Sequence, residues 1–270
     1  MLAAIDFNGS TYSQDFQAMT GTTTATAASL TGGAMVEINS LGGGGPAGWY
    51  TYMTTATGSR WFSSDTGSSN GGGFRQLIDS ASPTRGRALG SQGSGSAAGF
   101  YGIVLKNTSG STINSINISF DAVMNRNPSS TANSTAVSYR VSSTDVVTSA
   151  STGAGTFADA AGTWSSFSTD LGFTSPSSGT GAPGTQAAIS PLFKIATKTV
   201  SSQTVSWANN SFLYIRFSET DDTGSDSTQG VDNFSISANA ASPSITGVAT
   251  ATGFTTTYGT ASAAQSFSVS

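Results

Sequence analysis

The stretch INSINISFDAVM, residues 113–124, decides the fold class. Two sets of positions alternate in it: Ile116, Ile118, Phe120 and Ala122 on one side, and Asn117, Ser119, Asp121 and Val123 on the other. A period of two places the first set on one face of an extended chain. The stretch therefore predicts a β-strand with one buried face.

Further runs repeat this period, and turn-forming clusters separate them. The runs are FYGIVLK (100–106), TAVSYRV (135–141), FLYIRF (212–217) and VDNFSIS (231–237); the clusters include LGGGGPAG (41–48) and NRNPSSTANS (125–134). Many short strands between Gly, Ser, Asn and Pro clusters are typical of a β-sandwich. We expect an all-β protein, a jelly-roll-type antiparallel β-sandwich with a C-terminal β extension.

The composition changes near residue 240, where a linker containing Pro243 begins. The sequence predicts a sandwich over residues 1–240 and a separate segment over 241–270. That segment is either a β-strand extension or the start of a following β unit. It is too short to bury a core of its own.

Charge is sparse, and the polar positions are mostly Ser, Thr, Gly, Ala and Asn. Such a neutral, hydroxyl-rich surface is common in secreted and cell-surface bacterial β proteins, so we expect an extracellular location. The chain has 10 Lys and Arg against 14 Asp and Glu. No basic stripe exists for a nucleic-acid partner, and no apolar run has the length of a membrane span.

Several segments together resemble a known domain type. They are DFN (6–8), GWY (48–50), TGSSNGGG (66–73), the region 87–127, SFSTDLGFTSP (166–176) and LYIRFSETDDTGSDSTQGVDNFSI (213–236). In this order they resemble the jelly-roll-like domains of large secreted and surface-anchored bacterial proteins, over residues 5–238. Residues 242–270 resemble the start of the Ig-like repeats that often follow such domains. The resemblance implies a fold and a location but no activity.

More loosely, the arrangement resembles calcium-carrying carbohydrate-binding jelly rolls. In those proteins a last-strand Asp close to the N-terminal strand helps to hold a structural ion. The matching position here is Asp232, and Asp6 is the candidate partner from the first strand. The resemblance thus implies a calcium site that includes Asp232.

The stretch before the last strand is the most acidic part of the chain. Asp221, Asp222 and Asp226 follow Glu219 with no Lys or Arg among them. Calcium binds six to eight oxygens from carboxylates, carbonyls and water, and an ion would relieve the repulsion between these carboxylates. No EF-hand pattern fits, and a solvated acidic turn explains the same residues without an ion. Both readings stay open.

Catalytic chemistry has little support. The chain has no Cys and no His, which removes Ser-His-Asp and Cys-His centres and most zinc sites. Two carboxylates suffice for a glycosidase, but the two Glu residues, Glu37 and Glu219, lie in no strand of alternating acidic residues. We expect a protein that is not an enzyme.

Adhesion or glycan binding is the leading expectation, with a glycan or another cell-surface polymer as the partner. Sugars bind to aromatic platforms beside polar groups. Residues 49–62 concentrate the candidates Trp49, Tyr50, Tyr52 and Trp61. The alternative is that these rings pack in the core. The basic residues Arg60, Arg75, Arg85 and Arg87 are candidates for contact with an acidic glycan or for hydrogen bonds within loops.

The second hypothesis is self-assembly into an extracellular filament or surface layer. Edge strands offer unpaired backbone groups, and the segment 264–269 alternates in side-chain type. That segment could add to the sheet of a neighbouring copy. Alternatively, it is only part of a following repeat.

Overall fold

The computed structural model describes residues 4–20, 28–30, 32–33, 35–41, 44–56, 60–69, 71–79, 86–95, 97–129, 131–143, 157, 164–176, 188–219, 221–239 and 258–259. These residues form strands and one short 3-10 helix, η1 (Ile38–Leu41), so the all-β prediction is confirmed. They include no helix long and apolar enough to cross a membrane.

The strands form two eight-stranded sheets within the described residues. Sheet A contains β1 (Ile5–Phe7), β4 (Met35–Glu37), β5 (Trp49–Ala56), β9 (Ala97–Asn107), β11 (Ser134–Ser142), β12 (Ser165–Ser166), β13 (Phe173–Thr174) and β15 (Phe212–Glu219). Sheet B contains β2 (Tyr12–Gln14), β3 (Ala28–Leu30), β6 (Arg60–Asp65), β7 (Gly73–Ile78), β8 (Arg87–Gln92), β10 (Ile113–Arg126), β14 (Ala188–Trp207) and β16 (Thr228–Ala238).

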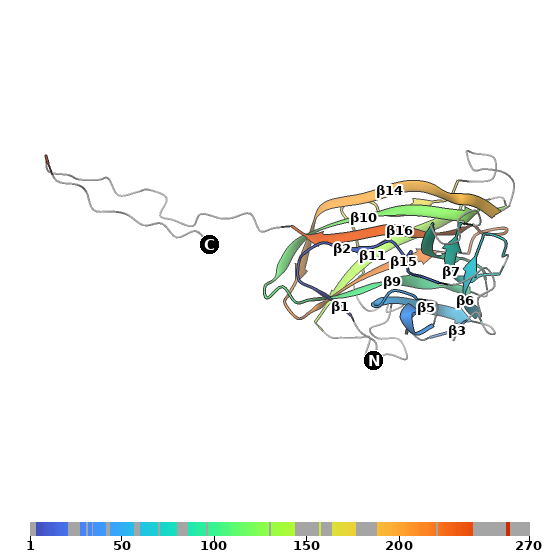
Figure 1. The fold of residues 1–270 in the computed structure, drawn as a ribbon, viewed down its shortest axis with the longest axis horizontal. Helices are drawn as coiled ribbons and strands as arrows, with labels where there is room; N and C mark the ends of the chain where they lie inside the picture. Colours follow the sequence, from blue (N-terminus) through green and yellow to red (C-terminus); the bar gives the residue numbers. More distant parts are fainter. Residues whose placement is uncertain are drawn as a thin grey trace. The chain divides into compact units, whose positions relative to one another are not determined.

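The two sheets pack face to face, which confirms the β-sandwich. Figure 1 shows β14, β10 and β16 side by side in one layer and β9 and β5 in the other. The long strands from β9 to β11 and from β14 to β16 alternate between the sheets. This alternation supports the jelly-roll description, which stays a prediction. The sheets are mixed rather than wholly antiparallel, because β1 runs parallel to β9 and β6 parallel to β7.

The stretch that predicted the fold is the centre of sheet B. Strand β10 pairs with β14 on one side and with β16 on the other. Ile116, Ile118, Phe120 and Ala122 all lie in the core between the sheets, at 2% exposure or less. The alternation therefore identified the buried face correctly.

The outer face of sheet A carries a second apolar cluster. Alternation along β15 places Leu213 and Phe217 in the main core and Phe212 and Tyr214 on the outer face, yet all four are buried. Phe157 and the partly buried Trp164 pack over this outer cluster. The central strands of sheet A are thus covered on both faces.

Within the described residues, the edge strands of both sheets carry features that oppose pairing with a further strand. Strands β12, β4 and β3 have two or three residues each, and β14 is the long edge strand. Strand β14 carries Pro191, Lys194 and Lys198, and its register with β10 shifts at several points. Short strands, Pro, Lys and irregular register all oppose strand addition. No described edge therefore favours self-assembly.

The contacts divide the chain into a unit of residues 1–239 and a unit of residues 240–270. Every named strand belongs to the first unit. The structure describes only residues 258–259 of the second. The predicted donor strand or following repeat lies outside the described residues.

Candidate functional site

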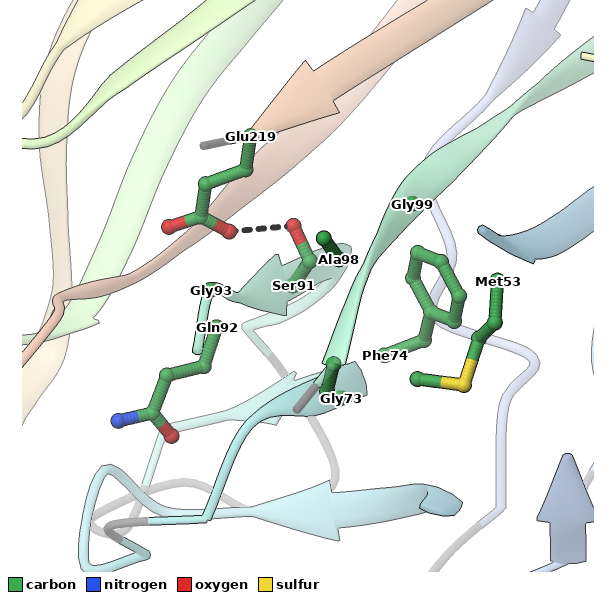
Figure 2. Close-up of a pocket in the computed structure, with 10 residues that line it drawn as sticks. Met53, Gly73, Phe74, Ser91, Gln92, Gly93, Ala98, Gly99 and Glu219 are labelled. Atoms are coloured by element: carbon green, nitrogen blue, oxygen red, sulfur yellow. Dashed lines mark hydrogen bonds between the residues drawn. The ribbon is translucent and has the colours of Figure 1, made fainter. Parts of the chain in front are cut away.

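Glu219 and Ser91 connect the two sheets at one end of the sandwich. Glu219 is the last residue of β15 and continues its inner face, and Ser91 faces it from β8 of the other sheet. The Ser91 hydroxyl donates to Oε2 of Glu219 at 2.5 Å, as the dashed line in Figure 2 shows. Glu219 is only 4% exposed. A carboxyl group therefore lies between the sheets, where apolar side chains usually pack.

Two further polar side chains complete a ring around this contact. Gln229 is the cross-strand neighbour of Ser91, and Thr135 is the cross-strand neighbour of Glu219. Nε2 of Gln229 donates to Oγ1 of Thr135 at 2.9 Å. Because opposed residues in a sheet have Cβ atoms about 5 Å apart, the side chains of Glu219, Ser91, Gln229 and Thr135 form a polar layer that closes this end of the core.

Asn133 joins this layer to the loop before β16 that contains Asp221, Asp222 and Asp226, which we call the acidic loop. Its Nδ2 donates to Oδ2 of Asp222 at 3.0 Å and to Oδ1 of Asp226 at 2.9 Å. Its Oδ1 accepts the backbone N–H of Ser227, which fixes which end of the amide faces the carboxylates. Asn133 is buried. A neutral amide thus lies between two carboxylates that have no Lys or Arg partner among the ion pairs of the described residues. We call Glu219, Asp222, Asp226, Asn133 and Gln229 the acidic end.

Several buried oxygens of the acidic end lack a hydrogen-bond partner. They are Oε1 of Glu219, Oδ2 of Asp226 and Oε1 of Gln229. The three residues are at most 4% exposed. An unsatisfied buried polar group costs about 1–3 kcal/mol. Such a concentration of unsatisfied acceptors is the chemistry that a hard cation or ordered water would relieve.

The free space beside Glu219 is small. It is lined by Ser91, Gly93 and Gly99 among others and has a cavity volume of about 10 Å³. That is room for about one water molecule or ion. In Figure 2 the side chain of Gln92 points away from Glu219, and Phe74 and Met53 lie on the far side of β9. No organic substrate fits beside this carboxyl.

Burial raises the pKa of two carboxyls of the acidic end, Glu219 and Asp226. Burial raises the pKa of Glu219 well above its ordinary value; the Ser91 hydroxyl opposes the rise, and Asp226 and Asp222 add to it. Burial likewise raises the pKa of Asp226 to about 6, against the hydrogen bond from Asn133. Both shifts share one cause, because burial disfavours the charged form of a carboxyl.

Asp232, which the resemblance made the central calcium ligand, lies elsewhere. We expected it to share a face with Phe234 and Ile236. The register between β10 and β16 shifts around Asp232, and Asn233 has a positive φ of 50°. This β-bulge places Asp232 opposite Asp121, on the outer face of sheet B, while Phe234 stays in the core. The prediction that Asp232 joins the loop carboxylates is wrong.

Asp6 is also remote from the acidic end. It is exposed and pairs with Lys106, whereas Glu219 pairs with Gly99 on the same strand, β9. Seven positions along a strand span roughly 23 Å. Of the predicted metal ligands, the structure brings together Asp222 and Asp226, with the exposed Asp221 next to them in the chain. Within the described residues, no group of three or more Asp and Glu side chains could hold a metal by itself.

The predicted aromatic platform is wrong for three of its four residues. Trp49 is fully buried, packs edge-on against Phe16 and Phe234, and donates from Nε1 to the hydroxyl of Tyr12 at 3.1 Å. Tyr50 and Tyr52 are buried in the outer cluster of sheet A. Because side chains on both faces of β5 are covered, Trp49, Tyr50 and Tyr52 are all buried, whichever face each ring lies on. The side chain of Trp61 lies outside the described residues.

The predicted basic cluster is also largely internal. Arg75 is 3% exposed and donates to the Ser63 hydroxyl at 2.6 Å and to the backbone carbonyl of Gly71. Arg87 is buried as well. The side chains of Arg60 and Arg85 lie outside the described residues. Arg75 therefore fixes the Gly-rich loop after β6 instead of meeting a glycan.

Comparisons with known proteins assign neither a family nor a function to this chain. No family model, no curated protein and no solved structure matches this chain. What the protein does is therefore argued from its own residues.

Proposed function

We propose that this protein is a non-catalytic extracellular module of a bacterial surface protein, for adhesion or glycan binding, with a structural calcium ion at the acidic end. One observation carries the proposal. Buried carboxylate and amide oxygens of Glu219, Asp226 and Gln229, three residues of the acidic end, lack hydrogen-bond partners. Calcium accepts this mixture of carboxylate, amide, backbone and water oxygens.

The geometry suggests which atoms a calcium ion would use. Asn133 occupies one oxygen of Asp222 and one of Asp226. A carboxylate has about four acceptor positions, so the second oxygens of both remain for an ion. Oε1 of Glu219 is the third candidate ligand. Within the described residues these three carboxyls do not form a metal-holding group by themselves, so water, amide and backbone oxygens would have to supply most of the coordination.

The absence of room beside Glu219 supports a non-catalytic role. Two carboxyls that act on a glycosidic bond need a substrate between them. The space at Glu219 admits about one water molecule. The acidic end would therefore stabilise the connection between β15 and β16, and any ligand of the module would bind elsewhere.

Thermal unfolding with and without calcium tests this proposal. For a dissociation constant of about 10⁻⁴ to 10⁻³ M, 10 mM Ca²⁺ should raise Tm by about 3–10 °C. Asp226→Asn and Glu219→Gln should abolish most of this shift. The matched controls Asp6→Asn and Asp232→Asn remove the same charge outside the acidic end and should retain it. The wild-type protein is first stripped of metal with a chelator, which is then removed. If 10 mM Ca²⁺ does not raise the Tm of this stripped protein, the proposal is overturned.

A further inference from the structure

Arg216 lies between two aromatic rings on the outer face of sheet A. Its Cζ is 4.4 Å from the centroid of the Phe100 ring and 3.9 Å from that of the Trp164 ring. Its cross-strand neighbour on β9 is Gly102, which has no side chain to occupy the surface there. The guanidinium can therefore lie against the sheet with a ring on each side, as cation–π contacts favour.

The guanidinium is held at two nitrogens and open at the third. Nε donates to the Ser138 hydroxyl at 3.0 Å, and Nη1 donates to the backbone carbonyl of Phe157. Nη2 makes no hydrogen bond in the described residues, yet it is not among their buried atoms without a partner, so it reaches solvent. Nη2 is therefore the nitrogen that can donate to a ligand.

The described residues place no carboxylate in an ion pair with this cation. None of the ion pairs in the described part of the chain includes Arg216. Burial lowers its pKa to about 10, so it stays charged at neutral pH. A half-buried cation without a counter-ion carries a desolvation cost that a bound anion would offset. Arg is suited to this role because its planar fork matches the two oxygens of a carboxylate.

The surroundings restrict the kind of anion. The chain has a net charge of −4, which opposes a polyanion, and a single guanidinium pairs with a single carboxylate. The rings of Phe100 and Trp164 are partly exposed and place apolar surface beside the guanidinium. We propose that Arg216, Phe100 and Trp164 bind one carboxylate-bearing sugar residue of the uronic-acid type. This inference rests on the proposed role as a binding module and is independent of calcium.

Titration of the full chain with galacturonic acid tests the site, read by NMR and by isothermal calorimetry. Galactose, acetate and N-acetylglutamate serve as the neutral sugar, the bare anion and the peptide-like carboxylate. We expect millimolar binding of galacturonic acid and at least about tenfold weaker binding of the other three. Arg216→Gln should weaken binding at least about tenfold. Lys198→Gln, which removes the same charge from sheet B, should change it less than twofold.

Each contrary result overturns the site in a distinct way. Acetate binding as tightly as galacturonic acid would leave a bare anion site. Tighter N-acetylglutamate would indicate an acidic peptide, and no binding would remove the site altogether. If Arg216→Gln does not fold, the guanidinium N–H signals of Arg216 in the wild type must shift on addition of galacturonic acid. Repeating the galacturonic acid titration with a chelator shows whether binding depends on calcium, so a failure of this site can be told from a failure of the calcium proposal.

Discussion

Nδ2 of Asn133 donates a 2.9 Å hydrogen bond to Oδ1 of Asp226, a residue 93 positions further along the chain. The same nitrogen also donates to Asp222. The amide therefore connects the loop before β11 with the loop before β16 and supplies the only side-chain donor that the structure describes for both carboxylates. Asn133 begins an Asn-x-Ser/Thr triplet, yet its burial leaves it no room for a glycan.

Asn133→Ala is expected to lower the free energy of unfolding by about 2–4 kcal/mol, because it removes the side-chain hydrogen bonds to two carboxylates and to the Ser227 amide. Urea unfolding at neutral pH measures this. Asn209→Ala is the control: Asn209 is exposed and accepts only the Gly110 amide at 3.1 Å. It should cost no more than about 1 kcal/mol. Equal losses in the two variants would contradict the role given to Asn133.

The sequence predicted the fold better than the site, for a physical reason. Period-two alternation reports burial on one face, so it identified the core side of β10 correctly. It cannot show that a second layer covers the outer face, as at Tyr50 and Tyr214, nor locate a bulge such as that at Asn233. The acidic loop was visible because its residues are close in sequence. Its partners Ser91 and Asn133 come from distant strands, and no local pattern indicates them.

Stability should rise as the pH falls from 7.5 to 5 in the absence of calcium. Burial raises the pKa of Asp226 to about 6 and, with repulsion from Asp121, that of Asp232 to about 7. Between the ordinary carboxyl pKa near 4 and these values, the folded state binds more protons than the unfolded state, so acid stabilises it. The cost of ionisation is fully present above the raised pKa values. Urea unfolding at several pH values measures the slope.

Two variants divide this pH dependence between its sources. Asp226→Asn and Asp232→Asn should each flatten the slope in part, Glu219 contributes a further share because burial also raises its pKa, and calcium should remove the shares of Asp226 and Glu219 but not that of Asp232. Asp121, whose pKa is lowered chiefly by its hydrogen bonds to Lys194 and Asn233, titrates below this range. A free energy of unfolding that increases from pH 5 to 7.5 without calcium would show that these carboxyls are not buried as described.

Trp49→Ala should lower the free energy of unfolding by about 3–5 kcal/mol, the usual cost of removing a fully buried aromatic ring. Trp49 packs against Phe16 and Phe234 and holds the Tyr12 hydroxyl. Chemical denaturation followed by circular dichroism measures the loss. Thr112→Ala, at an exposed position, should change stability by less than about 0.5 kcal/mol. A stable Trp49→Ala variant that lost sugar binding would restore Trp49 to a binding platform.

Gly230→Ala tests the close approach that positions Ser91 opposite the acidic end. Gly230 of β16 pairs with Gly90 of β8, and a Cβ at Gly230 would lie 2.2 Å from the carbonyl oxygen of Leu89. That contact is with backbone, so the strands themselves would have to separate and would move Ser91 away from Glu219. We expect a loss of at least about 2 kcal/mol in unfolding free energy together with a smaller calcium shift in Tm.

Gly110→Ala is the control, because its Cβ would meet nothing within 4 Å although its φ is +82°. It should cost only about 1 kcal/mol of backbone strain and leave the calcium shift intact. A Gly230→Ala variant with wild-type stability and a full calcium shift would mean that the β8–β16 contact does not position the site.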